Sequence, residues 1–132
     1  MRTLTRLAGT VGAAALIAGG VAASPAQARD AEVCMYNWHS QVDIIVAVGC
    51  FQHYGDKITV KDSWADGYRA VVKWETDYGR EGSCHNALGE GWTVTCDYDF
   101  AENKHLHFKT CIQKGAEGRE QDCTPWTGWI LT

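Results

Sequence analysis

Residues 92–100 read WTVTCDYDF, and their apolar and polar side chains alternate without a break. The apolar positions are Trp92, Val94, Cys96, Tyr98 and Phe100. Alternation with a period of two is typical of a strand with one buried face. Residues 104–112 repeat the pattern, so we expect two antiparallel strands joined by a turn at residues 101–103.

The polar face of this predicted hairpin carries four residues that can bind metals. Keeping both apolar faces on one side sets Asp97 opposite His107 and Asp99 opposite His105. Two histidines and two carboxylates on one face could bind zinc or copper. Two polar cross-strand pairs on a solvated sheet are the other interpretation, and we adopt it. No metal is therefore expected.

Further strands are expected wherever short alternating or β-branched runs lie between turns rich in glycine. Together with the first two, the segments are 33–38, 42–53, 57–62, 69–77, 83–88, 92–100, 104–112 and 120–131. Eight short strands without a helical segment predict an all-β fold, an antiparallel β-sandwich. Because Pro125 lacks a backbone N–H, we expect the last strand at a sheet edge.

The first 28 residues have the order of a secretory signal peptide. Arg2 and Arg6 precede an apolar run at residues 7–23, and small residues form an A-x-A cleavage site that ends at Ala28. Cleavage leaves residues 29–132, which are enough for a single domain. We therefore expect a secreted, extracellular protein.

The mature chain is acidic. Two of the twelve lysines and arginines lie in the predicted signal peptide and none of the sixteen acids does, so the mature net charge is −6. This charge argues against nucleic acid and against anionic membranes as partners. After residue 28 no apolar run approaches the roughly 20 residues that span a bilayer.

All six cysteines belong to the mature chain. An even number in an exported chain favours disulfides over metal ligands. Two cysteine pairs flank glycine-containing turns, at residues 89–91 and 115–119, so hairpin geometry places the members of each pair on opposed strands. The predicted bridges are Cys84–Cys96, Cys111–Cys123 and, from the two remaining cysteines, Cys34–Cys50.

Four of the six tryptophans are candidates for a binding surface. They are Trp38, Trp64, Trp126 and Trp129. The first two lie at predicted turns, and the last two fall on opposite faces of the predicted edge strand. Trp74 and Trp92 lie on apolar strand faces, so we expect both in the core. Exposed tryptophans serve sugar stacking and protein interfaces alike.

Support for catalysis is weak. No mature serine lies in a G-x-S-x-G turn. Ser83 and His85 share one face of a strand, but no orienting carboxylate can be assigned to them. The paired acids Asp97 and Asp99 point outward from a flat strand rather than into a cleft. We therefore predict no enzyme, no catalytic residue and no cofactor.

Several short runs resemble small secreted six-cysteine proteins of actinomycetes. These runs are Gly55-Asp56-Lys57-Ile58-Thr59-Val60-Lys61-Asp62, Ala65-Asp66-Gly67, Tyr78-Gly79-Arg80, Cys96-Asp97-Tyr98-Asp99 and Asp122-Cys123. The resemblance covers most of the mature chain. It implies a disulfide-bonded β-domain outside the cell and supplies no catalytic residues.

We predict a non-enzymatic protein-binding module of the inhibitor or adapter type. Its partner would be another secreted or cell-surface protein, bound through the edge strand at residues 120–131 or through aromatic turns. The alternative is a carbohydrate-binding domain that holds a polysaccharide on exposed tryptophans. A small secreted enzyme is the third hypothesis, and a metal binder on the histidine face is the fourth.

Overall fold

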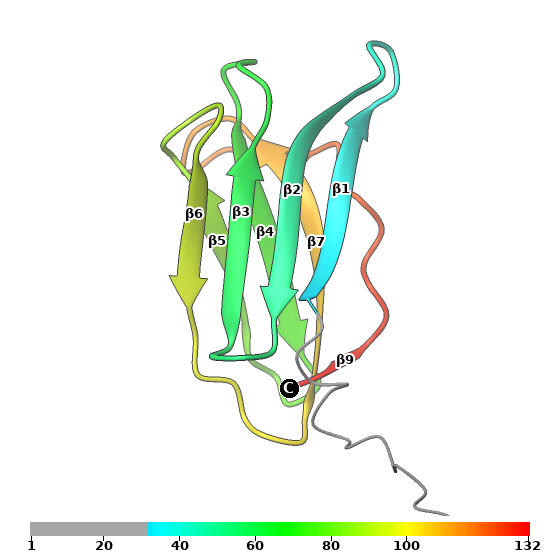
Figure 1. Cartoon of the computed structure of the whole chain (residues 1–132), viewed down its shortest axis with the longest axis vertical. Coiled ribbons are helices and arrows are strands. Elements are labelled where there is room, and N and C mark those ends of the chain that lie inside the picture. Colours follow the sequence, from blue (N-terminus) through cyan, green and yellow to red (C-terminus); the bar gives the residue numbers. More distant parts are fainter. Residues whose placement is uncertain (1–31) are drawn as a thin grey trace, which may run out of the picture.

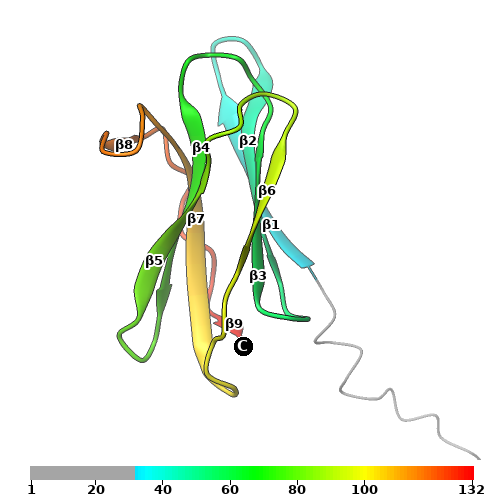
Figure 2. The same ribbon diagram turned by 90° about the vertical axis from the view of Figure 1, so that its left-hand side faces the viewer.

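Two antiparallel sheets lie face to face (Figures 1 and 2). The computed structural model describes residues 32–132, so the predicted signal peptide at residues 1–28 lies outside the described residues. The first sheet has the order β1-β2-β3-β6, and the second has the order β5-β4-β7-β8, with β9 also paired to β7. The strands are β1 (Glu32–His39), β2 (Ile44–Gln52), β3 (Lys57–Asp62), β4 (Arg69–Thr76), β5 (Glu81–Asn86), β6 (Thr93–Asp97), β7 (His105–Gln113), β8 (Glu120–Gln121) and β9 (Ile130–Leu131). The predicted all-β sandwich is confirmed.

The core lies between the sheets and follows the alternation in the sequence. Ile58 and Val60 of β3 face Val72 of β4 and Phe108 of β7, and all four side chains are fully buried. Burying each such side chain contributes roughly 1.5–3 kcal/mol. Within the described residues no helix is long and apolar enough to cross a membrane.

The predicted hairpin between residues 92–100 and 104–112 is wrong. β6 pairs with β3 of the first sheet, where Cys96 lies opposite Ile58, and β7 pairs with β4 of the second sheet. The chain between them crosses from one layer to the other (Figures 1 and 2). Tyr98 and Phe100 drive this crossing, because their rings pack against Trp74 at 4.9 and 5.0 Å and fill the end of the core.

All three predicted disulfides are confirmed. Cys34 and Cys50 are directly opposed on β1 and β2, as hairpin geometry requires. Cys84 and Cys96 lie instead on β5 and β6, which belong to different sheets, so this bridge ties the two layers together. The pairing is right, but the hairpin geometry from which it was predicted is wrong.

Residues 120–131 do not form the single edge strand that we predicted. Only β8 and β9 are strands, and the residues between them run irregularly alongside β7. Backbone N–H groups of Thr124 and Thr127 donate to the carbonyls of Thr110 and Phe108 at 2.9 and 2.8 Å. Their hydroxyls accept from the N–H groups of the same two residues at 3.0 and 3.1 Å. Threonine side chains thus replace part of a strand ladder.

Candidate functional site

The predicted cluster of two histidines and two aspartates does not form. His107 Nε2 lies 3.1 Å from Glu75 Oε2, and His105 Nδ1 lies 2.8 Å from Asp77 Oδ2. Asp97 lies opposite Lys57 in the first sheet, while both histidines belong to the second. The predicted cluster required residues 92–100 and 104–112 to be neighbouring strands. Because they are not neighbours, the cluster does not form.

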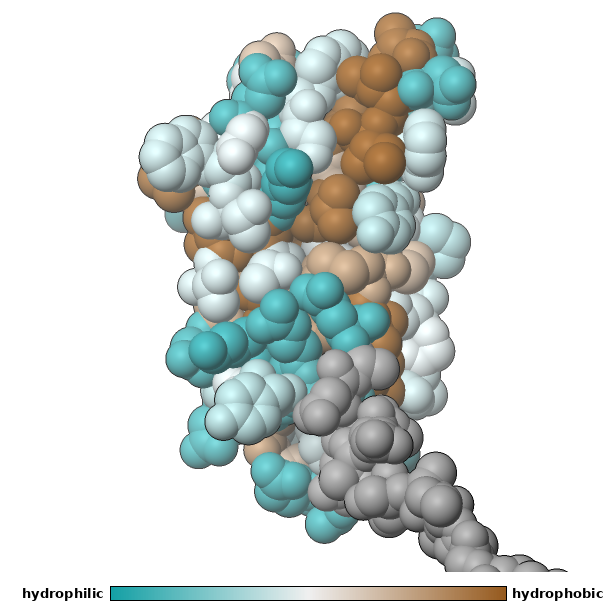
Figure 3. All heavy atoms as spheres, in the orientation of Figure 1, coloured by the Kyte–Doolittle hydropathy of each residue, from teal (hydrophilic) through white to brown (hydrophobic). Residues whose placement is uncertain are grey.

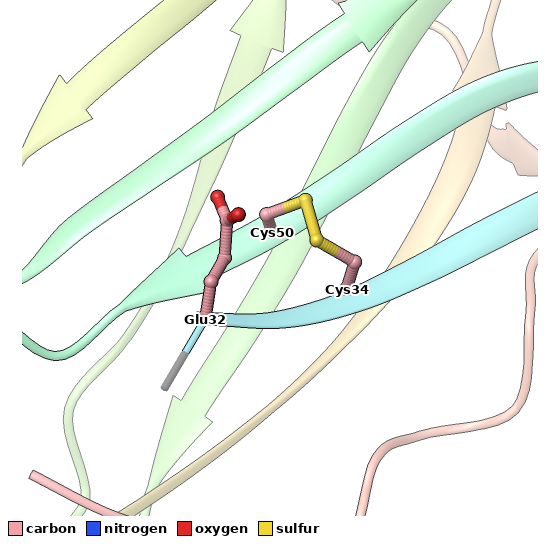
Figure 4. Close-up of side chains that lie close together, drawn as sticks. All are labelled: Glu32, Cys34 and Cys50. Carbon is pink, nitrogen blue, oxygen red and sulfur yellow. A yellow bond between two sulfur atoms is a disulfide. The ribbon is translucent and has the colours of Figure 1, made fainter. Parts of the chain in front are cut away.

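Two other groups of residues bring potential ligand atoms within 4.8 Å of one another. One consists of Glu32 with Cys34 and Cys50, drawn in Figure 4, and the other of Glu120 with Cys111 and Cys123. All four sulfur atoms are held in disulfides, so they offer no thiolate to a metal. Neither group is a metal site in this oxidation state.

The ring of His107 lies between Trp126 and Trp129. Both indoles are nearly parallel to the imidazole, with ring centres at 4.2 and 4.0 Å. Two indoles cannot lie flat on one face of the ring at these distances, so they cover opposite faces. Lys109 Nζ lies 5.0 Å from the Trp126 ring centre. This His107 stack holds the C-terminal residues on the second sheet, and it corrects the expectation that Trp126 and Trp129 face opposite ways.

Replacing His107 with alanine is expected to lower the free energy of unfolding by about 2 kcal/mol. The variant loses two aromatic contacts, each worth roughly 0.5–1.5 kcal/mol. Urea denaturation followed by tryptophan fluorescence measures the change. His105→Ala is the control, because His105 lies two residues away on the same strand and stacks on no ring within residues 32–132. Equal losses for the two variants would show that the stack does not stabilise the fold.

The four candidate tryptophans do not share a surface. Trp38 is 56% exposed on the first sheet, and Trp129 is 54% exposed over the second. Trp64 is half-buried against the core, and Trp126 is half-buried in contact with His107 and Lys109. The two exposed rings therefore lie on opposite sides of the sandwich and form no common platform for a sugar.

The core prediction holds for Trp74 and fails for Trp92. Trp74 is buried, whereas Trp92 is 61% exposed. Trp92 immediately precedes the first residue of β6, and its carbonyl accepts from Asn86 Nδ2 at the end of β5 while its ring remains exposed. Alternation along the sequence carries no information about where a strand ends.

Ser83 and His85 are in hydrogen-bonding contact on the outer face of β5. Ser83 Oγ lies 3.1 Å from His85 Nε2. Burial, with Arg69 and Lys73 nearby, lowers the pKa of His85, so its ring is neutral at pH 7. Its Nδ1 is buried and has no hydrogen-bond partner in the described residues. A hydrogen on Nδ1 would be an unsatisfied donor, so the hydrogen belongs on Nε2 and is donated to Ser83. This pair therefore does not activate the serine.

The outer edge of β1 is unpaired in the described residues. β1 pairs with β2 on one side only. The Cα atoms of Cys34 and Cys50 are 4.1 Å apart, the short spacing of a non-hydrogen-bonded pair, in which N–H and C=O groups point away from the partner strand. The backbone N–H and C=O groups of Tyr36, two residues further along β1, also point away from β2. Beyond the ladder with β2, neither Cys34 nor Tyr36 makes a backbone hydrogen bond within residues 32–132.

β1 is also the least protected edge of the sandwich. It has eight residues and no charge or proline from Val33 to Trp38. The edge strands β5 and β6 have six and five residues and contain Glu81 and Asp97 respectively. Natural proteins protect sheet edges with charges, prolines and short strands, whereas β1 is longer than β5 and β6, has no proline and carries its acidic residue, Glu32, only at its first position.

A strip of apolar side chains lies beside this edge. Tyr36 is opposite Val48 on β2, and Trp38 is opposite Ile45. Tyr36 is 52% exposed, and Val42 in the connecting turn is exposed as well. Figure 3 shows apolar side chains over the upper part of β2 and the β1–β2 hairpin. We call these five residues the apolar edge surface. Exposed apolar patches on soluble domains mark interaction sites.

A hollow of about 360 Å³ opens at the end of β1. Asn37, Trp38 and His39 line it from β1, and Asp122, which follows β8, lines it from the other side. Asn37 is 4% exposed, and its Nδ2 donates to the carbonyls of Thr110 and Asp122. The hollow and the apolar edge surface share Trp38, so together they form one candidate site.

Sequence reasoning found Trp38 and missed Tyr36. A signal for Tyr36 exists in the sequence. In a strand, Cys34, Tyr36 and Trp38 lie on one face, and Val33 and Met35 lie on the other. Both faces of the segment are apolar, yet an edge strand of a two-layer sandwich buries only one of them. Recognising Tyr36 as exposed requires knowing that nothing packs on the outer face of β1, and that depends on topology.

The chain matches no family model, no curated protein and no solved structure. Its function is therefore inferred from the site itself.

Proposed function

We propose that the protein is a secreted, non-enzymatic module that binds another extracellular protein along β1. An extended segment of the partner adds to the first sheet next to β1 and takes up the outward N–H and C=O groups of Cys34 and Tyr36. Tyr36 and Trp38 supply the side-chain contacts, in keeping with the enrichment of Tyr and Trp at the energetic centres of interfaces. The observation that carries this proposal is the unpaired edge of β1, without charge from Val33 to Trp38, beside exposed aromatic rings.

An extracellular location fits the chemistry of the described residues. All six cysteines are in disulfides, and such bridges persist in oxidising compartments. The partner is expected in the same compartment, as a secreted or cell-surface protein. Binding along β1 would serve an inhibitor and an adapter equally well. The identity of the partner distinguishes these two roles.

The carbohydrate alternative has less support. A sugar platform needs exposed rings on one face, and because Trp38 and Trp129 lie on different sheets, such a platform would rest on Tyr36 and Trp38. A protein partner uses these two rings and the open backbone edge of β1 as well, and a sugar leaves that edge unpaired.

Replacing Tyr36 and Trp38 together with serine is expected to weaken partner binding at least about 30-fold. Removing one interface hot spot costs 2 kcal/mol or more, and 1.4 kcal/mol is a factor of ten in affinity. Immobilised mature protein, wild type or variant, is incubated with culture supernatant of the source organism, and retained proteins are quantified by mass spectrometry. A photo-crosslinking residue at position 36 then identifies which retained protein touches β1.

Trp92→Ser is the matched control for this experiment. Trp92 is as exposed as Trp38 but adjoins β6, at the opposite edge of the first sheet. The proposal requires a protein that wild type and Trp92→Ser retain and the Tyr36/Trp38 variant loses. Retention that is unchanged in the double variant, or lost equally in the control, would contradict it.

A further inference from the structure

We infer that the hollow at the end of β1 accepts a lysine or arginine side chain from the partner segment. This inference rests on the proposed function and adds the chemistry of one partner residue. It follows from the charge of the hollow, from the fixed orientation of Asn37 and from the position of the hollow at the end of the open edge.

The charge of the hollow is one-sided. Asp122 contributes a carboxylate, and Ser40 and Gln41 add further side-chain oxygens. None of the described residues that line it is a lysine or an arginine, and His39 is the one basic side chain among them. The carboxylates of Glu75, Asp77 and Glu120 elsewhere on the surface each have a cationic group or a histidine within 4 Å, and Asp122 has none among residues 32–132. A cationic side chain would be the complementary occupant.

Asn37, which lines the hollow, has a fixed side-chain orientation. Both partners of its Nδ2 are backbone carbonyl oxygens, which cannot donate, so the amide orientation is determined. Its Oδ1 is then the free acceptor of a side chain that is 96% buried and held at two points. An acceptor positioned in this way loses little freedom when a donor arrives, which favours binding of a multi-donor group.

The hollow also lies where an added strand would end. The ladder between β1 and β2 is regular from Glu32 to Asn37 and shifts between Asn37 and Trp38. A partner strand that follows the straight part of β1 reaches the irregularity, and its next side chain lies beside Trp38 and Asp122. The aliphatic part of a lysine or arginine can pack on the Trp38 ring while its head group reaches the carboxylate.

The test uses N-acetyl-arginine amide and N-acetyl-lysine amide as probes of the hollow in the mature wild-type protein. We expect saturable NMR shifts of the Asn37 side-chain amide and the Trp38 indole N–H with at least one probe. N-acetyl-citrulline amide, the neutral analogue of the arginine probe, should bind at least five-fold more weakly. Asp122→Asn should weaken the cationic probe by a similar factor, because it removes the charge and keeps the shape.

Asp43→Asn is the matched control. Asp122 and Asp43 are both exposed and both have positive φ, 46° and 51°, which asparagine also tolerates. Asp43 lies in the neighbouring hairpin turn and does not line the hollow. Asp43→Asn should leave the shifts unchanged.

The inference is overturned if no probe gives saturable shifts. It is also overturned if the citrulline probe binds wild type as tightly as the cationic probe does, or if the cationic probe binds Asp122→Asn as tightly as wild type. The proposed function fails in a different way. If Asp122→Asn abolishes probe binding while partner capture is independent of Tyr36 and Trp38, the hollow binds cations but β1 is not the docking edge. If capture depends on Tyr36 and Trp38 but no probe binds, β1 is the edge and the hollow has no cationic occupant.

Discussion

Replacing both Cys84 and Cys96 with alanine is expected to lower the free energy of unfolding by about 4 kcal/mol. The bridge closes a loop with a sequence separation of 12, which restricts the unfolded chain by roughly 3 kcal/mol. Cys84 is fully buried, so its removal also leaves space between the layers, which adds about 1 kcal/mol. Thermal and urea denaturation of the oxidised variant measure both effects together.

The Cys34–Cys50 bridge is the control. Its sequence separation of 16 gives nearly the same restriction of the unfolded chain, but it joins two strands of one sheet that remain paired without it. Alanine at both positions should cost about 3 kcal/mol. If this variant loses as much stability as the Cys84/Cys96 variant or more, the bridge between the layers has no special part in holding the sheets together.

The sequence predicts which side chains are buried better than it predicts which strands are neighbours. Alternation identifies Ile58, Val60, Trp74 and Phe108 as core residues, because each strand has one face against the other sheet. The same alternating pattern is compatible with any neighbouring strand. It therefore could not show that β6 pairs with β3 rather than with β7. The three-residue turn favoured a local hairpin, and the aromatic packing of Tyr98 and Phe100 outweighs that preference.

The candidate site shows the same limit. Cys84 and Cys96 are paired as predicted, but they join the two layers and not the two strands of a hairpin. The histidine and aspartate cluster needed the correct neighbour for each strand, and it is lost. Trp38 was identified by residue type, whereas the open edge of β1 and the hollow at its end arise from sheet order and from contacts between Asn37 and Asp122 that are 85 residues apart.

The open edge is compatible with a stable monomer because the opposite side of the molecule is closed. On that side β5 and β6 are joined by a disulfide. On the side of β1, the C-terminal residues cover the edge of β7 through Thr124 and Thr127 and are held by the His107 stack. The residues of this cover make no backbone–backbone hydrogen bond to β1 within residues 32–132, although the Asn37 side chain donates to the Asp122 carbonyl. The second sheet is thus protected while the first sheet leaves one strand free, which is the arrangement that strand addition requires.

Gly49→Ala is expected to lower the free energy of unfolding by about 3 kcal/mol. A Cβ at this position of β2 would lie 2.3 Å from Val72 Cγ2 and 2.4 Å from Thr110 Oγ1, much closer than van der Waals contact. Thr110 cannot yield cheaply, because its hydroxyl donates to the Met35 carbonyl at 3.2 Å and its side chain is buried. Overpacking of a close-packed interior costs roughly 1–3 kcal/mol, and contacts with two residues of the opposite sheet place this case at the upper end.

Two further variants show whether the loss at Gly49 comes from the lack of space between the sheets. Gly128→Ala adds the same methyl group where no atom lies within 4 Å, so stability should change by less than about 0.5 kcal/mol. Gly49→Ala combined with Val72→Ala should be at least about 1 kcal/mol more stable than the sum of the single losses, because truncating Val72 removes one of the two close contacts of the new Cβ and leaves the one with Thr110. Strict additivity would mean that the two positions do not compete for space. In that case the close approach of the sheets at Gly49 would not explain why glycine occupies this strand position.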